Sequence, residues 1–266
     1  MDISRLGTIL CLALVVPVVS AQAPQQRPSQ IRSSYAIQAE AWQIVLLANH
    51  ARAQAGAGPL KWDAALAAAA RMHCLRMAEE GVISHQYVDE PEISERAAQA
   101  GAHFSVIEEN VAIAPDPASI HNAWMRSAGH RANLLNPQVD RVGVAVVAGR
   151  NGLFAVADYE RAVPVLTQAQ VEAAVTSMVS ASGITVLQDP TLARTACAAD
   201  EGVPHPASGA KPRYVMRWQD ADLTQLPEDL ADSLSSGKYR QASVGSCPTQ
   251  NLEGSFTAYR LAVLLY

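Results

Sequence analysis

The stretch "AWMRSAGHRANLL" at residues 123–135 decides how the fold of this chain is interpreted. Apolar residues recur along it as on an amphipathic helix, and the small residues of Ser127–Gly129 interrupt the pattern just before His130. Glycine allows a helix to terminate and the backbone to turn. We therefore expect the helix to end at Gly129 and His130 to project from that end.

Helical signals dominate the sequence before this stretch. Apolar residues at helical spacing follow Ile37, and Asp63 precedes an alanine-rich helix that Gly81 can stop. His73 lies on the inner face of that helix, where a hydrogen-bonded core imidazole is the more ordinary interpretation than a ligand. The stretch "HFSVIEENVAIA" at residues 103–114 is extended, and a further helix starts at Asp116 and Pro117.

Two β-rich runs follow it, on either side of the turn residues at 149–152, as in a β-hairpin. Helices precede and interrupt the strands without the regular alternation of a doubly wound sheet. This order predicts a mixed or antiparallel sheet with helices on both faces, that is, an α+β protein.

Five motifs in one order carry a resemblance to a known family. They are "LLANHARAQAGAGPLKWDAALAAAARMH", "ISHQ", "EENVA", "AWMRSAGHRANLL" and "RVGVAVV". Together they resemble the bacterial branch of the CAP superfamily, which comprises cysteine-rich secretory, antigen 5 and pathogenesis-related-1 proteins with SCP-like extracellular domains. The resemblance covers residues 35–161. It implies an α-β-α sandwich and a surface cleft lined by two histidines and acidic residues.

Carried over motif by motif, the resemblance places His85, Glu109, Asn110 and His130 around that cleft. The chain departs from the family where eukaryotic members have a second glutamate, because Ser127 stands there. The lost negative charge should weaken any site for a divalent cation.

Three interpretations of the cleft stay open. His85, His130 and Glu109 could form an incomplete Zn²⁺ shell with positions open to water. Glu109 could instead orient a histidine as a general base, or the three side chains could form a hydrogen-bonded cluster that joins helices to the sheet. Ser127 lacks the surroundings of a nucleophile elbow, and we expect its hydroxyl to bond a backbone carbonyl at a helix end.

The N-terminal residues indicate export. Residues 1–23 have an arginine, an apolar run and a small-residue end, which is the layout of a secretory signal peptide. Residues 24–34 are polar and predict a flexible leader. Since no second apolar run is long enough to span a bilayer, we expect a secreted or periplasmic protein without a membrane span. The formal net charge of −5 gives no indication of nucleic-acid binding.

Residues 162–266 form a separate C-terminal α+β region in this interpretation. Its pattern around "VLQDPTLARTACAADEGVPH" echoes the first region, so it is either a degenerate CAP-like repeat without a site or an unrelated α+β extension. Cys197 and Cys247 are expected to form a disulfide, and Cys74 a buried free thiol.

Two functions follow from this reading. The first is a secreted, non-catalytic module that binds a small molecule, lipid, glycan, protein or divalent metal through the cleft. The second is an exported metal-dependent or acid-base hydrolase at the cell envelope.

Overall fold

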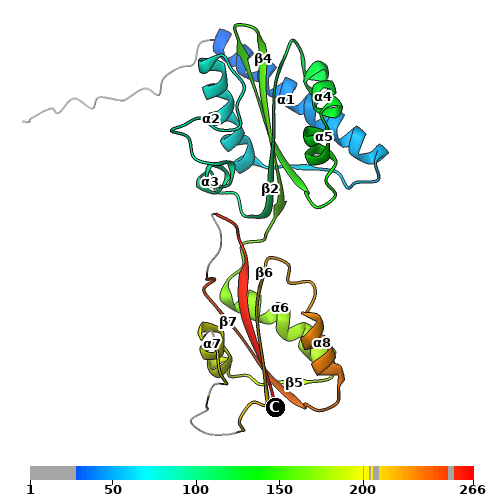
Figure 1. Cartoon of the computed structure of the whole chain (residues 1–266), viewed down its shortest axis with the longest axis vertical. Coiled ribbons are helices and arrows are strands. Elements are labelled where there is room, and N and C mark those ends of the chain that lie inside the picture. The colour runs from blue at the N-terminus through cyan, green and yellow to red at the C-terminus, as the bar shows by residue number, and fades with distance from the viewer. Residues whose placement is uncertain (1–27, 200, 204, 206–209, 251–254) are drawn as a thin grey trace, which may run out of the picture.

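The computed structural model describes residues 28–199, 201–203, 205, 210–250 and 255–266. The predicted signal peptide at residues 1–23 lies outside them. Two α+β domains follow one another end to end (Figure 1). The first helix begins at Pro28, within the range of residues 24–34 for which the sequence predicted a flexible leader. Proline is favourable at the first helical position because the N–H that it lacks has no partner there.

The described part of the first domain contains nine helices and strands. In chain order the elements are α1 (Pro28–Gln54), β1 (Lys61–Trp62), α2 (Ala64–Glu80), α3 (Ile93–Gln99), β2 (Phe104–Ala114), α4 (Pro117–Arg126), α5 (Ala128–Leu135), β3 (Arg141–Gly149) and β4 (Gly152–Ala162).

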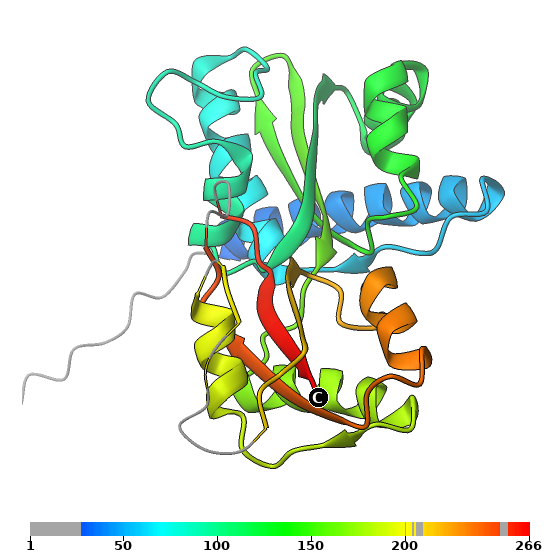
Figure 2. The same cartoon turned by 60° about the horizontal axis from the view of Figure 1, so that its bottom comes forward.

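One sheet with the order β1-β3-β4-β2 separates two layers of helices. β1 runs parallel to β3, and the other neighbours are antiparallel. Helices α1, α4 and α5 cover one face, and α2 and α3 cover the other (Figures 1 and 2). Successive side chains on a strand point to opposite faces of the sheet. Val144 and Val146 therefore pack toward α1, whereas Ala145 packs toward α2. The predicted α-β-α sandwich is confirmed.

The predicted helix boundaries have identifiable side-chain causes. The Asp63 carboxylate accepts hydrogen bonds from the N–H groups of Ala65 and Leu66, which begins α2. Gly81 ends α2 in the left-handed conformation, at a φ of 74°. Asp116 caps α4 in the same way as Asp63 caps α2. These caps satisfy backbone groups that a helix leaves unpaired at its ends.

The second domain has the same strand order and strand directions as the first. Its elements are α6 (Gln168–Ala181), β5 (Thr185–Val186), α7 (Thr191–Ala198), β6 (Tyr214–Asp220), α8 (Glu228–Ser235), β7 (Gln241–Cys247) and β8 (Tyr259–Leu265). The sheet order is β5-β7-β8-β6, with β5 parallel to β7. Helices α6 and α8 cover one face and α7 the other. The degenerate CAP-like repeat stays a prediction.

Strand β7 is an element that the sequence did not indicate. Its residues "QASVGSC" include two serines and a glycine, which give a weak strand signal. The disulfide from β7 to α7 was indicated: Cys197 and Cys247 are bonded, with their Cα atoms 5.8 Å apart. Cys74 is a buried free cysteine, as expected.

A glycine in each domain lets a helix approach the sheet closely. A Cβ atom on Gly143 of β3 would lie 2.1 Å from the backbone nitrogen of Ala67 in α2. A Cβ atom on Gly245 of β7 would lie 2.3 Å from the backbone nitrogen of Arg194 in α7. Ala67 and Arg194 are each the fourth residue of their helix. The two glycines therefore hold equivalent positions.

We expect Gly143→Ala to lower the free energy of unfolding by about 2 to 3 kcal/mol, because α2 must shift away from β3 to admit the methyl group. Gly129→Ala is the matched control: Gly129 is helical, and a Cβ atom there meets nothing within 4 Å. The control should gain about 0.5 to 1 kcal/mol from helix propensity. Chemical denaturation of both variants measures the difference, and equal stabilities would contradict the proposed contact.

No helix among the described residues combines the length and the apolar character that a membrane span requires. The two domains contact each other directly. The Thr257 N–H donates to the Phe104 carbonyl at 2.8 Å, and the Phe104 and Phe256 rings meet edge to face at 5.3 Å.

Candidate functional site

The predicted cleft residues gather at the exposed edge of the first sheet. β2 is the edge strand, and successive side chains on it point to opposite faces. Glu109 points toward α2 and α3, where it contacts Arg96, whereas Asn110 points toward α5 and bonds its backbone. Helices on both faces of the sheet therefore contact the same edge strand.

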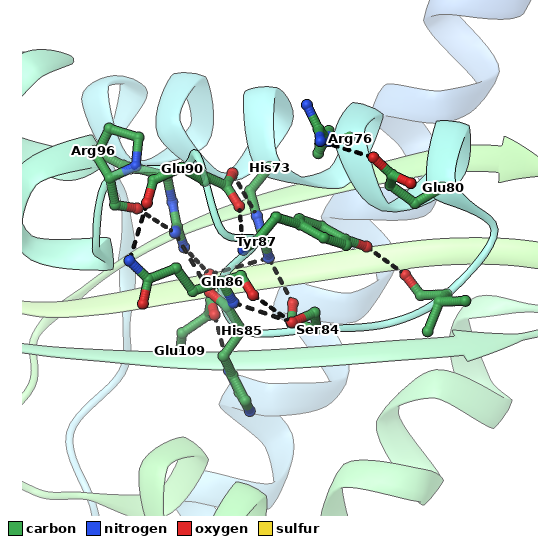
Figure 3. A network of polar contacts seen from close by, with 12 residues as sticks. His73, Arg76, Glu80, Ser84, His85, Gln86, Tyr87, Glu90, Arg96 and Glu109 are labelled. Carbon is green, nitrogen blue, oxygen red and sulfur yellow. Dashed lines mark hydrogen bonds and ion pairs between the residues drawn. The ribbon is translucent and has the colours of Figure 1, made fainter.

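Glu109 is the centre of the polar network. Its side chain is 4% exposed, and it accepts a hydrogen bond from Arg96 through Oε2 at 2.5 Å. Oε1 lies 2.8 Å from Nδ1 of His85. Figure 3 shows both side chains converging on this carboxylate. With both oxygens engaged, Glu109 holds the His85 ring in one orientation, and Nε2 of that ring is left to face outward.

His73 supports the loop that carries His85. The His73 ring is fully buried, as its helix face predicted, and it has two partners. Nδ1 lies 2.7 Å from the Glu90 carboxylate, and Nε2 lies 2.7 Å from the Ser84 carbonyl (Figure 3). These bonds tie both ends of the loop after Gly81 to α2. The loop that carries His85 is therefore anchored to α2.

His130 reaches the site differently from the prediction. The helix breaks at Ser127, which ends α4 and begins α5, so Gly129 and His130 lie in the first turn of α5. The expectation that a helix ends at Gly129 is wrong, because extended φ and ψ angles at Ser127 already make the turn. The His130 carbonyl accepts a hydrogen bond from Asn110 at 2.9 Å. Its ring centroid lies 6.1 Å from that of His85.

The two imidazoles have opposite electrostatic surroundings. The hydrogen bond with Glu109 raises the pKa of His85 above its ordinary value, against an opposing effect of burial. Burial lowers the pKa of His130, and the neighbouring His85 lowers it further. As the pH falls, His85 therefore takes up its proton before His130 does.

The contacts of the asparagines show a structural role on the α5 side. Asn133 of α5 donates through Nδ2 to the Glu109 carbonyl and to Oδ1 of Asn110, each at 3.1 Å. Asn110 is fully buried. These two amides join α5 to the edge strand, and they fix the position of His130 relative to Glu109.

Ser127 takes no part in the network. Within the described part of the chain its hydroxyl has no hydrogen bond to the helix or to either histidine. The expectation that this hydroxyl bonds a backbone carbonyl is therefore wrong, because the extended backbone at Ser127 separates it from the helical carbonyls. A serine hydroxyl that contacts no general base is not activated as a nucleophile.

The residues fit a metal ion poorly. Zinc sites in enzymes have three protein ligands, but Glu109 has both oxygens engaged by His85 and Arg96. The described residues include no group of three or more His, Cys, Asp or Glu arranged to hold a metal ion. In this geometry Glu109 orients His85 and has no free oxygen for a metal ion. Of the three zinc ligands that the sequence offered, only the imidazoles of His85 and His130 are left.

A shallow cavity of about 310 Å³ adjoins His85. It is lined by His85, Gln86, Glu92, Ile93, Ile107, Glu108 and Glu109. Because the His85 side chain is 59% exposed, a ligand in this cavity can reach its outer ring nitrogen.

Two buried residues beside Glu109, Arg96 and Asp158, were not predicted from the sequence. Arg96 lies in a short helix among ordinary surface residues, and its buried contact with Glu109 depends on how α3 packs. Asp158 lies opposite Glu109 on β4, and it is fully buried. A charged residue in the middle of the apolar run "LFAVADY" was the available signal.

The fold and the site together define a class of protein. Residues 45–159 match the cysteine-rich secretory protein family, CAP. This match lies within the N-terminal domain and confirms the CAP resemblance that the motifs predicted.

Two relatives come from Bacillus subtilis (strain 168). The uncharacterized protein YkwD is 31% identical over 105 residues, which cover 39% of this chain and 41% of YkwD. The uncharacterized membrane protein YlbC is 32% identical over 106 residues, which cover 39% of this chain and 30% of YlbC. The chain thus spans less than half the length of either relative.

Among solved structures, an extracellular protein containing a SCP domain from Bacillus anthracis is 26% identical, with a TM-score of 0.46. The match covers 52% of this chain and 45% of that protein. A cysteine-rich secretory protein from Staphylococcus aureus is 20% identical with a TM-score of 0.40, over 53% of this chain and 44% of that protein.

Proposed function

We propose that this protein is an exported binding module whose CAP domain holds a ligand with anionic or hydrogen-bond-accepting oxygens over His85. The observation that carries the proposal is the contact between Glu109 and Nδ1 of His85, which leaves Nε2 exposed beside the cavity. A protonated His85 donates through both ring nitrogens, so Nε2 offers a charged donor. His130 adds a second imidazole at the same edge.

The proposal of export rests on two features. Residues 1–23 have the pattern of a signal peptide. The disulfide between Cys197 and Cys247 is of the kind that persists in oxidising compartments outside the cytosol.

Sulfate is a suitable probe, because its charge stays constant between pH 5 and pH 8 and only the protein titrates. We expect sulfate to shift the Nε2 signal of His85 in nitrogen-edited NMR spectra, and its affinity to rise as the pH falls through the pKa of His85. A charge-assisted hydrogen bond contributes about 1.5 to 3 kcal/mol. His85→Gln should therefore weaken sulfate binding about tenfold or more.

The control variant is His103→Gln, because His103 is an exposed histidine of the same domain that lies outside the site. Equal losses in both variants, or sulfate binding that does not depend on pH, would overturn the proposal. Titration with ZnCl₂ separates the metal interpretation, since an imidazole must be neutral to bind zinc and zinc affinity would fall with falling pH. Zinc binding that is lost in both His85→Gln and His130→Gln would favour a metal site.

The second candidate function is an exported acid-base hydrolase, and the same Glu109–His85 contact favours it. A carboxylate that orients an imidazole is the arrangement of a general base and its support. The test is hydrolysis of 4-nitrophenyl acetate by the purified protein. A rate that falls about a hundredfold or more in His85→Gln, and not in His103→Gln, would favour the hydrolase over the binding module.

A further inference from the structure

Asp158 is a buried acid of the first domain and stands beside the Glu109–His85 contact. It is 0% exposed. Neither of its oxygens has a hydrogen-bond donor among the described residues. Buried polar groups normally have a partner, because an unpaired one loses its interactions with water and gains nothing in return.

The sheet register places Asp158 directly opposite Glu109. The two residues are paired positions on the antiparallel strands β4 and β2, and side chains at paired positions lie on the same face of a sheet. Two ionised carboxylates cannot bond to each other, because neither carries a donor. A proton on Asp158 supplies the missing donor, and Glu109 is the acceptor within its reach.

We propose that Asp158 keeps its proton in the folded protein and donates a hydrogen bond to the Glu109 carboxylate, and that it thereby acts as a positioning residue for His85. Glu109 then has a donor on three sides: Arg96, His85 and Asp158. The assembly holds one buried negative charge where the sequence places two carboxyl groups.

The groups around Asp158 leave little to stabilise a second negative charge. Arg96 of α3 faces the pair, but its charge is engaged by Oε2 of Glu109. His73 of α2 has both nitrogens bonded elsewhere and lies 3.9 Å from Glu109. Cys74 of α2 is a neutral buried thiol, and β3 contributes Gly143 opposite Asp158. Burial and the charge of Glu109 both raise the pKa of Asp158 well above its ordinary value.

The second domain shows that the fold itself does not require an acid at this place. Gly245 pairs with Ala262 as Gly143 pairs with Asp158, so Ala262 holds the equivalent position. Arg217 stands opposite Ala262, where the first domain has Glu109. Its guanidinium bonds the carbonyls of Ala196 and Gly202, at 2.6 Å each. The acid is therefore present in the domain that has the Glu109–His85 contact and absent from the equivalent position of the second sheet.

The first test is spectroscopic and uses the full chain. The infrared difference between wild type and Asp158→Asn at pH 7 should contain the carbonyl band of a protonated carboxylic acid. Glu160→Gln is the matched control, because burial raises the pKa of Glu160 on the same strand to about 8 and its band should be lost separately. If Asp158→Asn does not fold, the aspartate carboxyl signals of ¹³C-labelled wild type answer the same question. One aspartate should keep the signal of the acid form at pH 7.

The second test uses linkage between pH and stability. A carboxyl group whose pKa is raised by folding stabilises the native state below its unfolded pKa, and this contribution is lost as the pH rises toward the folded value. Wild type should therefore lose up to about tenfold in its folding equilibrium constant per pH unit above pH 4, relative to Asp158→Asn. The amide of the variant can still donate to Glu109, so the NMR signal of the His85 Nδ1 proton should persist. In Asp158→Ala this signal should broaden or move.

Three results would overturn the proposal. They are an infrared difference that shows an ionised carboxylate at pH 7, a pH profile of stability that is the same in wild type and Asp158→Asn, and a His85 signal that is unchanged in Asp158→Ala. An ionised Asp158 would mean that Arg96 neutralises both carboxylates.

Discussion

Replacing Arg52 by methionine is expected to lower the free energy of unfolding of the first domain by about 3 to 5 kcal/mol, because Arg52 is a buried cation bonded to backbone carbonyls. Its side chain is 1% exposed. The guanidinium donates to the carbonyls of Gly58, Leu134, Asn136 and Val139, over distances of 2.7 to 2.9 Å. Methionine fills much of the volume and leaves these acceptors without a donor.

This prediction connects stability to the site, because three of the four carbonyls belong to the end of α5 and the segment after it. His130 lies at the other end of the same helix. Arg126→Met makes the same chemical change at an exposed position of α4 and should alter stability by less than about 0.5 kcal/mol. Urea denaturation measures both variants. A loss below about 1 kcal/mol in Arg52→Met would show that water replaces the guanidinium without cost.

Removing the disulfide should destabilise the second domain by about 3 to 4 kcal/mol, since the bond closes a long loop and restricts the unfolded chain. Cys197 and Cys247 are 50 residues apart. The double variant Cys197→Ala/Cys247→Ala removes the bond without leaving an odd thiol. Small domains have a limited core, so a loss of this size is a large part of their stability.

Tryptophan fluorescence can follow this loss in the correct domain. Trp218 lies in β6, and the other three tryptophans precede residue 163. Variants that keep Trp218 alone therefore report unfolding of the second domain. Cys74→Ala, at a buried free cysteine of the first domain, should leave this transition unchanged. An unchanged midpoint in the double variant would contradict the prediction.

The predictable parts of the site came from short stretches with local meaning. Asp63, Gly81 and Asp116 mark helix ends through bonds to backbone groups a few residues away. The motifs around His85, Glu109 and His130 predicted the class of domain, and residues 45–159 confirm it. The disulfide partners were predicted because two cysteines share the C-terminal third.

The roles within the site were not predictable in this way. The sequence left Glu109 open as a metal ligand, as the support of a general base or as part of a structural cluster, and in the structure its two oxygens are engaged by His85 and Arg96. The position of the helix break near His130 was misjudged by two residues, because glycine favours a break but does not require one. Ser127 makes the turn instead.

The sequence by itself determined the capped helix ends, the β3–β4 hairpin and the CAP class of the first domain, because caps, periodicity and motifs act over a few residues. The disulfide followed from two cysteines that share the C-terminal third. The tertiary structure alone decided that Arg96 bonds Glu109, that Asp158 stands opposite Glu109 in the sheet, and that Arg52 holds the end of α5. Each of these contacts joins residues that are far apart in the chain or on different elements. Strand register and helix packing set their geometry, and burial sets their charge, so no local pattern in the sequence records them.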